Sequence, residues 1–100
     1  MNLHASDIKL FVDLDTVLGL KAVANLNRFL AGYHIALEHA DIVDIHSDVQ
    51  ALIDYRITAT PCLLLQREGK PLRKLIGDMN NTELLQSFCD RYFNEMKHAE

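Results

Sequence analysis

The fold is decided by residues 59–78, which read Ala59-Thr60-Pro61-Cys62-Leu63-Leu64-Leu65, then Arg67-Glu68-Gly69-Lys70-Pro71, then Leu72-Arg73-Lys74-Leu75-Ile76-Gly77-Asp78. Pro61 has no backbone N–H to donate, so it belongs at the start of a strand or at a sheet edge. The apolar run 62–65 therefore predicts a strand that begins after Pro61. The Gly-containing segment 67–71 predicts a turn into a second strand, so that the two strands form an antiparallel hairpin.

Strands and helices alternate on both sides of this hairpin. Asp15 or Thr16 can cap a helix that Gly32 ends, Asp48 can cap a second helix, and Asn80 with Glu83 resembles a capping box for the last one. The expected elements are a strand over 8–12, a helix ending at Gly32, a strand over 37–44, a helix over 49–55, the hairpin, and a final helix after Asn80.

Both long helices show an apolar face at helical spacing. In the first helix this face consists of Val17, Leu18, Ala22, Val23, Leu26, Phe29 and Leu30. In the last helix it consists of Leu84, Leu85, Phe88, Cys89, Tyr92, Phe93 and Met96. Both faces are expected to cover the sheet, with Cys89 as part of the core.

The element order is β-α-β-α-β-β-α, a parallel β-α-β unit followed by a hairpin that carries the last helix. This order is typical of the thioredoxin-like α/β fold. In that fold the proline before the hairpin is cis, at a cost of about 0.5–1 kcal/mol relative to trans. Pro61 is therefore a cis-proline candidate, and a trans proline that opens a strand is the alternative.

The 100 residues, with 49% hydrophobic and 24% charged side chains, predict one domain over 1–100, with frayed ends at 1–7 and 97–100. The net charge of −4 does not favour a nucleic-acid partner. We find no signal peptide and no membrane-spanning segment, and we expect a cytoplasmic protein.

Few residues are placed for catalysis. A thioredoxin-fold oxidoreductase carries its reactive thiolate at the start of the first helix, where the helix dipole lowers the thiol pKa. Residues 13–18 contain no cysteine, so the chain is expected not to be an enzyme. Cys62 is the remaining redox candidate, although neighbouring aspartates would raise its pKa. The spacing of His34, His39 and His46 predicts a solvated edge rather than a metal site, and no cofactor is expected.

Charge is concentrated on the hairpin, where Arg67, Lys70, Arg73 and Lys74 occur within eight positions. Two interpretations stay open from the residues alone. Edge charges keep an exposed hairpin soluble. They also suit a docking surface for an acidic protein, because such charges set orientation and association rate.

These residues resemble the KaiB family of bacterial clock proteins and the KaiB-like sensor domain of the SasA histidine kinase. The resemblance covers residues 8–85. It rests on Lys9-Leu10-Phe11-Val12, Val43-Asp44-Ile45, Ala59-Thr60-Pro61 and above all Leu72-Arg73-Lys74-Leu75-Ile76-Gly77-Asp78.

The resemblance implies a non-catalytic module that binds a KaiC-type ATPase, in competition with a SasA-like kinase, in clock-like or stress-related regulation. Binding would use Arg73, Lys74, Gly77 and Asp78. The resemblance also implies that the second half of the chain can exchange the thioredoxin-like fold for the alternative KaiB ground-state fold. It further implies a homo-oligomer, a dimer or tetramer, as one of the states open to the chain.

Two segments depart from the family pattern. Residues 13–18 replace the loop that follows the first strand in the family, and residues 66–71 replace its Pro-rich segment. The second change predicts a simple hairpin turn, which favours the thioredoxin-like pairing of the flanking strands. We therefore expect a divergent KaiB-like protein, with a single-cysteine redox protein that uses Cys62 as the alternative.

Overall fold

A computed structural model describes the backbone of residues 3–98 and the side chains of residues 3–93. The predicted core position of Met96 therefore lies outside the described side chains. The elements follow the predicted order. They are η1 (Ala5–Asp7), β1 (Ile8–Val12), α1 (Val17–Ala31), η2 (Leu37–His39), β2 (Asp41–Asp44), α2 (Val49–Asp54), β3 (Cys62–Leu65), β4 (Arg73–Ile76) and α3 (Thr82–His98), where η1 and η2 are 3-10 helices.

The four strands form one mixed sheet in the order β2-β1-β3-β4. β1 and β2 are parallel, whereas β1–β3 and β3–β4 are antiparallel. The predicted β-α-β unit and hairpin are therefore confirmed, and with them the thioredoxin-like α/β fold class. The Thr60–Pro61 peptide bond is cis and directly precedes β3, the central hairpin strand.

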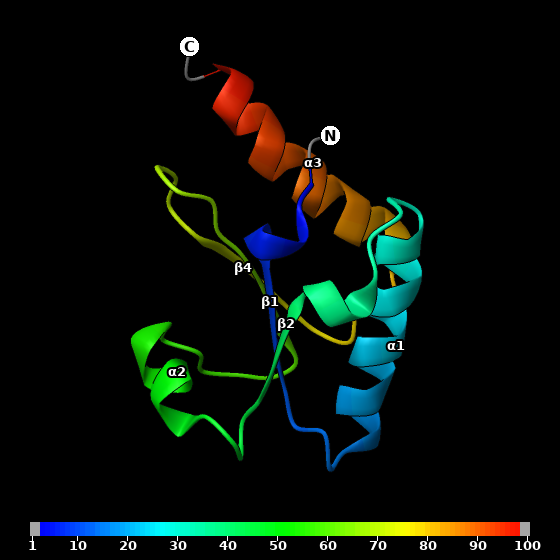
Figure 1. The fold of residues 1–100 in the computed structure, drawn as a ribbon, viewed down its shortest axis with the longest axis vertical. Coiled ribbons are helices and arrows are strands. Elements are labelled where there is room, and N and C mark those ends of the chain that lie inside the picture. The colour runs from blue at the N-terminus through cyan, green and yellow to red at the C-terminus, as the bar shows by residue number, and fades with distance from the viewer. Residues whose placement is uncertain (1–2, 99–100) are drawn as a thin grey trace.

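Helices cover both faces of the sheet: Figure 1 shows α1 and α3 on one side and α2 on the other. Successive strand residues point to opposite faces. Leu10, Val12 and Leu63 accordingly belong to the larger core cluster, beneath α1 and α3. Phe11 and Leu64 belong to a smaller cluster beneath α2. The apolar run 62–65 is continuous because both faces of β3 are buried.

The start of α1 is closed by local contacts that the sequence predicts. The Thr16 hydroxyl accepts a hydrogen bond from the Gly19 N–H at 3.0 Å, so Thr16 is the N-cap. Position 19 requires glycine, because a Cβ there would lie 2.0 Å from the carbonyl oxygen of Asp13. Gly32 is the C-cap of this helix, and Asp48 caps α2 by accepting from the Ala51 N–H.

Two predicted boundaries are wrong. The strand expected over 37–44 is limited to Asp41–Asp44, because residues 37–39 form a 3-10 turn in which Leu37 packs against the core. The cap of α3 is Asn81, not Asn80, since the Asn81 side chain accepts from the Leu84 N–H at 3.0 Å. With Asn81 as the cap, the third helical residue is Leu84 rather than Glu83, and a leucine side chain cannot complete the expected capping box.

Three side chains assigned to the apolar helix faces are exposed instead. Val17 is 71% exposed, Leu18 is 49% exposed, and Leu84, at the start of α3, is 53% exposed. All three lie in the first turn of their helix, which extends past the edge of the core, so helical spacing alone does not predict their burial. They leave apolar surface near the end of the sheet where α1 begins.

The N-terminal segment is ordered by contacts that the sequence analysis missed. The expectation that residues 1–7 are frayed is wrong for residues 3–7, because Leu3 is 9% exposed and residues 5–7 form η1. The carboxylate of Asp7 forms an ion pair with the guanidinium of Arg67 at the hairpin. Residues 1–2 and 99–100 lie outside the described part of the chain.

Candidate functional site

The predicted partner-binding residues Arg73, Lys74, Gly77 and Asp78 lie on β4 and in the loop that follows it. The Gly77 N–H donates to the carbonyl oxygen of Pro61 at 2.9 Å. The Asn25 amide of α1 donates to the carbonyl oxygen of Asp78 at 2.8 Å. This loop is therefore anchored both to the cis-proline and to α1, and Gly77 has a φ of 133°, which favours glycine.

Arg73 and Lys74 do not share one face of the sheet, contrary to the single docking surface expected from sequence. Arg73 pairs in register with Leu65 and lines a hollow with Phe88 and Tyr92 of α3. Lys74 pairs with Leu64 on the α2 face, and its ammonium donates to the carbonyl oxygen of Arg56 at 2.9 Å. The two cations therefore flank the outer edge of β4 from opposite faces.

The other two basic side chains of the hairpin have structural contacts. The guanidinium of Arg67 pairs with Asp7 and lies 4.5 Å from the centre of the Phe93 ring. The ammonium of Lys70 donates to the carbonyl oxygen of Tyr92 at 2.7 Å. These contacts hold the hairpin turn against α3. Of the four basic side chains, Arg67 and Lys70 therefore stabilise the hairpin, whereas Arg73 and Lys74 flank the outer edge of β4.

Apolar side chains beside the cationic edge were missed by the sequence analysis. Ile76, the last residue of β4, is 57% exposed, and Leu84 is 53% exposed. Together with Met79 they line a small hollow of about 100 Å³ that includes Gly77 and Asp78. Exposed apolar side chains at a strand edge, next to cations, are typical of a protein-binding surface. Apolar residues in a strand or a helix are normally expected in the core, so no local sequence signal identifies Ile76 and Leu84 as exposed.

Cys62 does not lie in an environment that activates a thiol. It is 1% exposed and packs in the cluster beneath α2. Burial raises the pKa of the Cys62 thiol, and the nearby Lys74 offsets this increase only in part. The expected direction of the shift is correct, but its main cause is burial rather than neighbouring aspartates.

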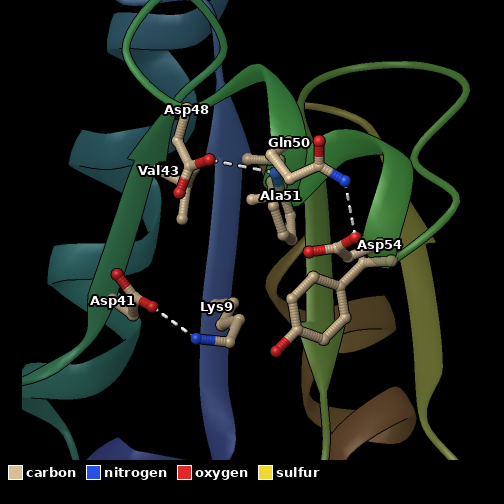
Figure 2. A pocket seen from close by; sticks show the side chains of 9 residues that line it. Lys9, Asp41, Val43, Asp48, Gln50, Ala51 and Asp54 are labelled. Carbon is tan, nitrogen blue, oxygen red and sulfur yellow. Dashed lines mark hydrogen bonds and ion pairs between the residues drawn. The ribbon is translucent and has the colours of Figure 1, made fainter.

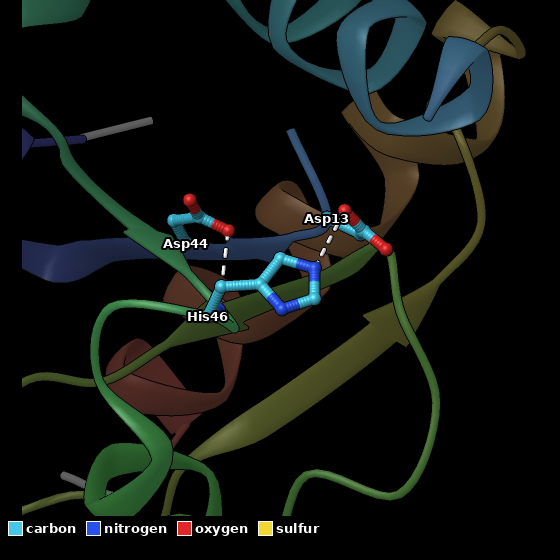
Figure 3. A group of neighbouring side chains, drawn as sticks. All are labelled: Asp13, Asp44 and His46. Atoms are coloured by element: carbon cyan, nitrogen blue, oxygen red, sulfur yellow. Dashed lines mark hydrogen bonds and ion pairs between the residues drawn. The ribbon is translucent and has the colours of Figure 1, made fainter. Parts of the chain in front are cut away.

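The carboxyl ends of β1 and β2 bring together three polar side chains that are distant in sequence (Figure 3). Ligand atoms of Asp13, Asp44 and His46 all lie within 4.8 Å of one another. The His46 Nε2 is 3.1 Å from an oxygen of Asp13, and the His46 N–H donates to Asp44. Asp13 also accepts from the Asp15 N–H. These contacts connect the loop that follows β1 to the loop that follows β2. The contacts of His46 are with this group and not with His34 or His39.

A polar cavity of about 280 Å³ lies between β2 and α2 (Figure 2). The Lys9 ammonium pairs with Asp41 and lies 5.6 Å from the centre of the Tyr55 ring. Asp48 and Asp54 also line this cavity, so three carboxylates surround a single cation. The charge of this side of the sheet is therefore opposite to that of the β4 edge.

No helix within residues 3–98 is long and apolar enough to cross a lipid bilayer.

Comparison with known proteins identifies two relatives by sequence. No protein-family model matches the chain. The circadian clock protein KaiB3 of Synechocystis sp. is 29% identical over 83 residues, which are 83% of this chain and 80% of that protein. The circadian clock oscillator protein KaiB of Cyanothece sp. is 28% identical over 93 residues, which are 93% of this chain and 88% of that protein.

Two solved structures similar to the chain are thioredoxins. Mitochondrial thioredoxin 3 of Saccharomyces cerevisiae matches with a TM-score of 0.66 at 19% identity, covering 83% of this chain and 76% of that one. The germline-specific thioredoxin Deadhead of Drosophila melanogaster matches with a TM-score of 0.65 at 13% identity, covering 86% and 83%. At such low identity these matches establish the fold alone.

Proposed function

Because the chain is a divergent KaiB-like protein with a thioredoxin-like fold, we propose that it is a non-catalytic interaction module that binds a KaiC-type ATPase in clock-like or stress-related regulation. A SasA-like histidine kinase would compete for the same partner. The observation that carries the proposal is the outer edge of β4. There the exposed Ile76 follows two cationic side chains along the strand, beside the anchored loop of Gly77 and Asp78.

Three properties of this edge support protein binding. Within residues 3–98, β4 pairs only with β3, so its outer backbone groups are available to a partner strand. The cations flank that edge and suit an acidic partner surface. The loop that follows is held by hydrogen bonds to Pro61 and Asn25, so the surface is preorganised and little conformational entropy is lost on binding.

Reversing both charges should weaken binding. We expect the double variant Arg73→Glu, Lys74→Glu to raise the Kd for a purified KaiC-type ATPase from the same organism by about tenfold or more, because it sets like charges against an acidic partner. Calorimetric titration with ADP and with ATP present measures this change. The double variant Lys21→Glu, Arg28→Glu, on the exposed face of α1, makes the same change in net charge and serves as the control.

The circular dichroism spectrum and melting temperature of both double variants should match those of the unmodified protein. An affinity unchanged by the β4 substitutions would remove this edge from the proposal. Absence of binding by the unmodified protein, in either nucleotide state, would contradict the proposed partner itself.

The alternative function, a single-cysteine redox protein that uses Cys62, makes a different prediction. Because Cys62 and Cys89 are both buried and burial raises both pKa values, we expect a disulfide reagent to react slowly with the native protein and rapidly with both thiols in denaturant. The reaction is followed by absorbance at neutral pH. Rapid reaction of one native thiol, lost in Cys62→Ser and retained in Cys89→Ser, would favour the redox function instead.

A further inference from the structure

The sheet ends in two edge strands of equal length that differ in charge. Within residues 3–98, β2 pairs only with β1 and β4 pairs only with β3, so one side of each edge strand is left without a backbone partner from this part of the chain. An unpaired edge is a template for another strand. Both edges are four residues long, Asp41–Asp44 and Arg73–Ile76.

The β2 edge is acidic. Asp41 and Asp44 lie on the strand itself, and Asp48 and Asp54 line the adjoining cavity. Figure 2 shows Asp41, Asp48 and Asp54 around that cavity, with Lys9 as the cation drawn there. Because one ammonium faces three carboxylates, the cavity carries a net negative charge.

The β4 edge is cationic, and this difference selects how two edges can meet. Joining two β2 edges would place Asp41 and Asp44 of both copies along one seam. Joining two β4 edges would do the same with Arg73 and Lys74. Like charges on adjacent strands are destabilising, whereas opposite charges stabilise the pairing. A β2 edge therefore complements a β4 edge and not another β2 edge.

The strand directions allow this pairing to continue the sheet. β2 is parallel to β1, β3 is antiparallel to β1, and β4 is antiparallel to β3. β4 therefore runs in the same direction as β2. If one copy is placed beside another in the same orientation, its β4 becomes a parallel neighbour of β2.

The side chains match in this parallel register. Asp41 and Val43 lie on the α2 face, beside Lys9 and Phe11, and Lys74 and Ile76 lie on the same face of β4, beside Leu64 and Cys62. Setting Asp41 beside Lys74 also sets Ile42 beside Leu75 and Val43 beside Ile76. One ion pair and two apolar pairs form together, and the exposed Ile76 side chain gains a neighbour.

From this complementarity we infer that the β4 edge of one copy of this chain binds the β2 edge of a second copy. The Lys74 ammonium has three N–H donors, so it can keep its contact with the Arg56 carbonyl and still reach Asp41 of the neighbour. The carboxylate of Asp41, paired with Lys9, retains lone pairs for a second cation. The contact is heterologous, so each copy uses both edges and the product is an open row or a closed ring.

This self-association is independent of the proposed function, because it needs no ATPase. It is measured by sedimentation velocity on the purified chain alone over a range of concentrations. We expect the weight-average sedimentation coefficient to rise with concentration at low ionic strength. High salt should suppress the rise, because it screens the ion pair between Asp41 and Lys74.

Complementary charge reversals test which edges meet. Lys74→Glu makes the β4 edge acidic, and Asp41→Lys makes the β2 edge cationic, so each variant alone should have a Kd for self-association raised about tenfold or more. An equimolar mixture of the two should associate again, because the acidic β4 edge of one variant complements the cationic β2 edge of the other. Recovery in the mixture cannot arise from loss of folding.

A matched control separates these edges from net charge. Lys21→Glu on α1 makes the same charge change as Lys74→Glu at an exposed position away from β2 and β4, and it should associate like the unmodified protein. If Asp41→Lys unfolds because it adds a cation beside Lys9, Asp54→Lys replaces it, since the Asp54 carboxylate accepts a hydrogen bond from the exposed Gln50.

Two outcomes would overturn the inference. One is a sedimentation coefficient of the unmodified protein that is independent of concentration at low ionic strength. The other is association that survives Lys74→Glu and Asp41→Lys individually.

Discussion

Replacing Arg67 with Met should lower the free energy of unfolding by about 3–5 kcal/mol, the cost of removing one partner of a buried ion pair. The Asp7 side chain is 6% exposed and that of Arg67 is 19% exposed, so water screens this pair little. The Nε of Arg67 also donates to the second oxygen of Asp7 at 3.1 Å. Without the guanidinium, the Asp7 carboxylate would remain buried with its charge uncompensated.

The same substitution also loosens three elements that meet at Arg67. The guanidinium packs on the Phe93 ring of α3, and Asp7 joins η1 to the turn of the hairpin. The hydrogen bond from the Arg67 N–H to the Tyr92 hydroxyl, at 3.0 Å, involves only the backbone of residue 67 and should remain. The loss is therefore expected to come from the charge and the guanidinium, not from the hairpin turn itself.

Chemical denaturation of two further variants completes this experiment. Arg28→Met, on the exposed face of α1, should change the stability by no more than about 0.5 kcal/mol. The double variant Asp7→Leu, Arg67→Met should recover part of the loss, because it removes the stranded charge together with its partner. Equal losses in Arg67→Met and Arg28→Met would contradict a structural role for this ion pair.

Alkaline solution should destabilise the protein through Cys89. This side chain is 1% exposed on the sheet-facing side of α3, and burial, with a smaller contribution from Asp90, raises the pKa of its thiol from 9.0 to about 12. Above pH 9.0 the Cys89 thiol loses its proton in the unfolded chain, whereas in the native protein it stays protonated. Stability is therefore fully present below that pH and is lost as the pH rises towards 12, by about 1.4 kcal/mol per pH unit.

Comparison with Cys89→Ala isolates this effect, since lysine and tyrosine side chains also titrate in alkaline solution. The variant should be less stable at neutral pH, because it leaves a small cavity. Its deficit relative to the unmodified protein should then shrink by about 2–3 kcal/mol between about pH 8 and pH 11. Stability curves that stay parallel over this range would show that the buried thiol does not control the alkaline transition.

Much of the fold follows from signals within a few residues of each other. The Thr16 and Asp48 side chains cap helices because each accepts from an N–H three positions later, a contact that the local sequence specifies. The run 62–65 after Pro61 needs only its continuous apolar character to predict a buried strand. The boundary errors at residues 37–40 and 80–81 arise where turn and strand or cap signals compete over one or two positions.

The candidate site was predicted less completely. Arg73 and Lys74 are adjacent in a strand, so the period of two could have placed them on opposite faces from sequence alone. The exposure of Ile76 could not have been predicted in this way. Whether an apolar residue at the end of a strand is buried depends on which elements lie beside that strand, and this depends on the order of strands in the sheet.

The amino-acid sequence by itself determined the element order, the caps of α1 and α2, the position of the cis-proline candidate and the absence of a thiol at the start of α1, because these depend on backbone preferences and neighbours close along the chain. Only the tertiary structure decided the partners of its charges. Arg67 meets Asp7 across 60 positions, and His46 meets Asp13 across 33. Sheet topology brings such residues together, and it also leaves an acidic edge and a cationic edge at opposite ends of one sheet.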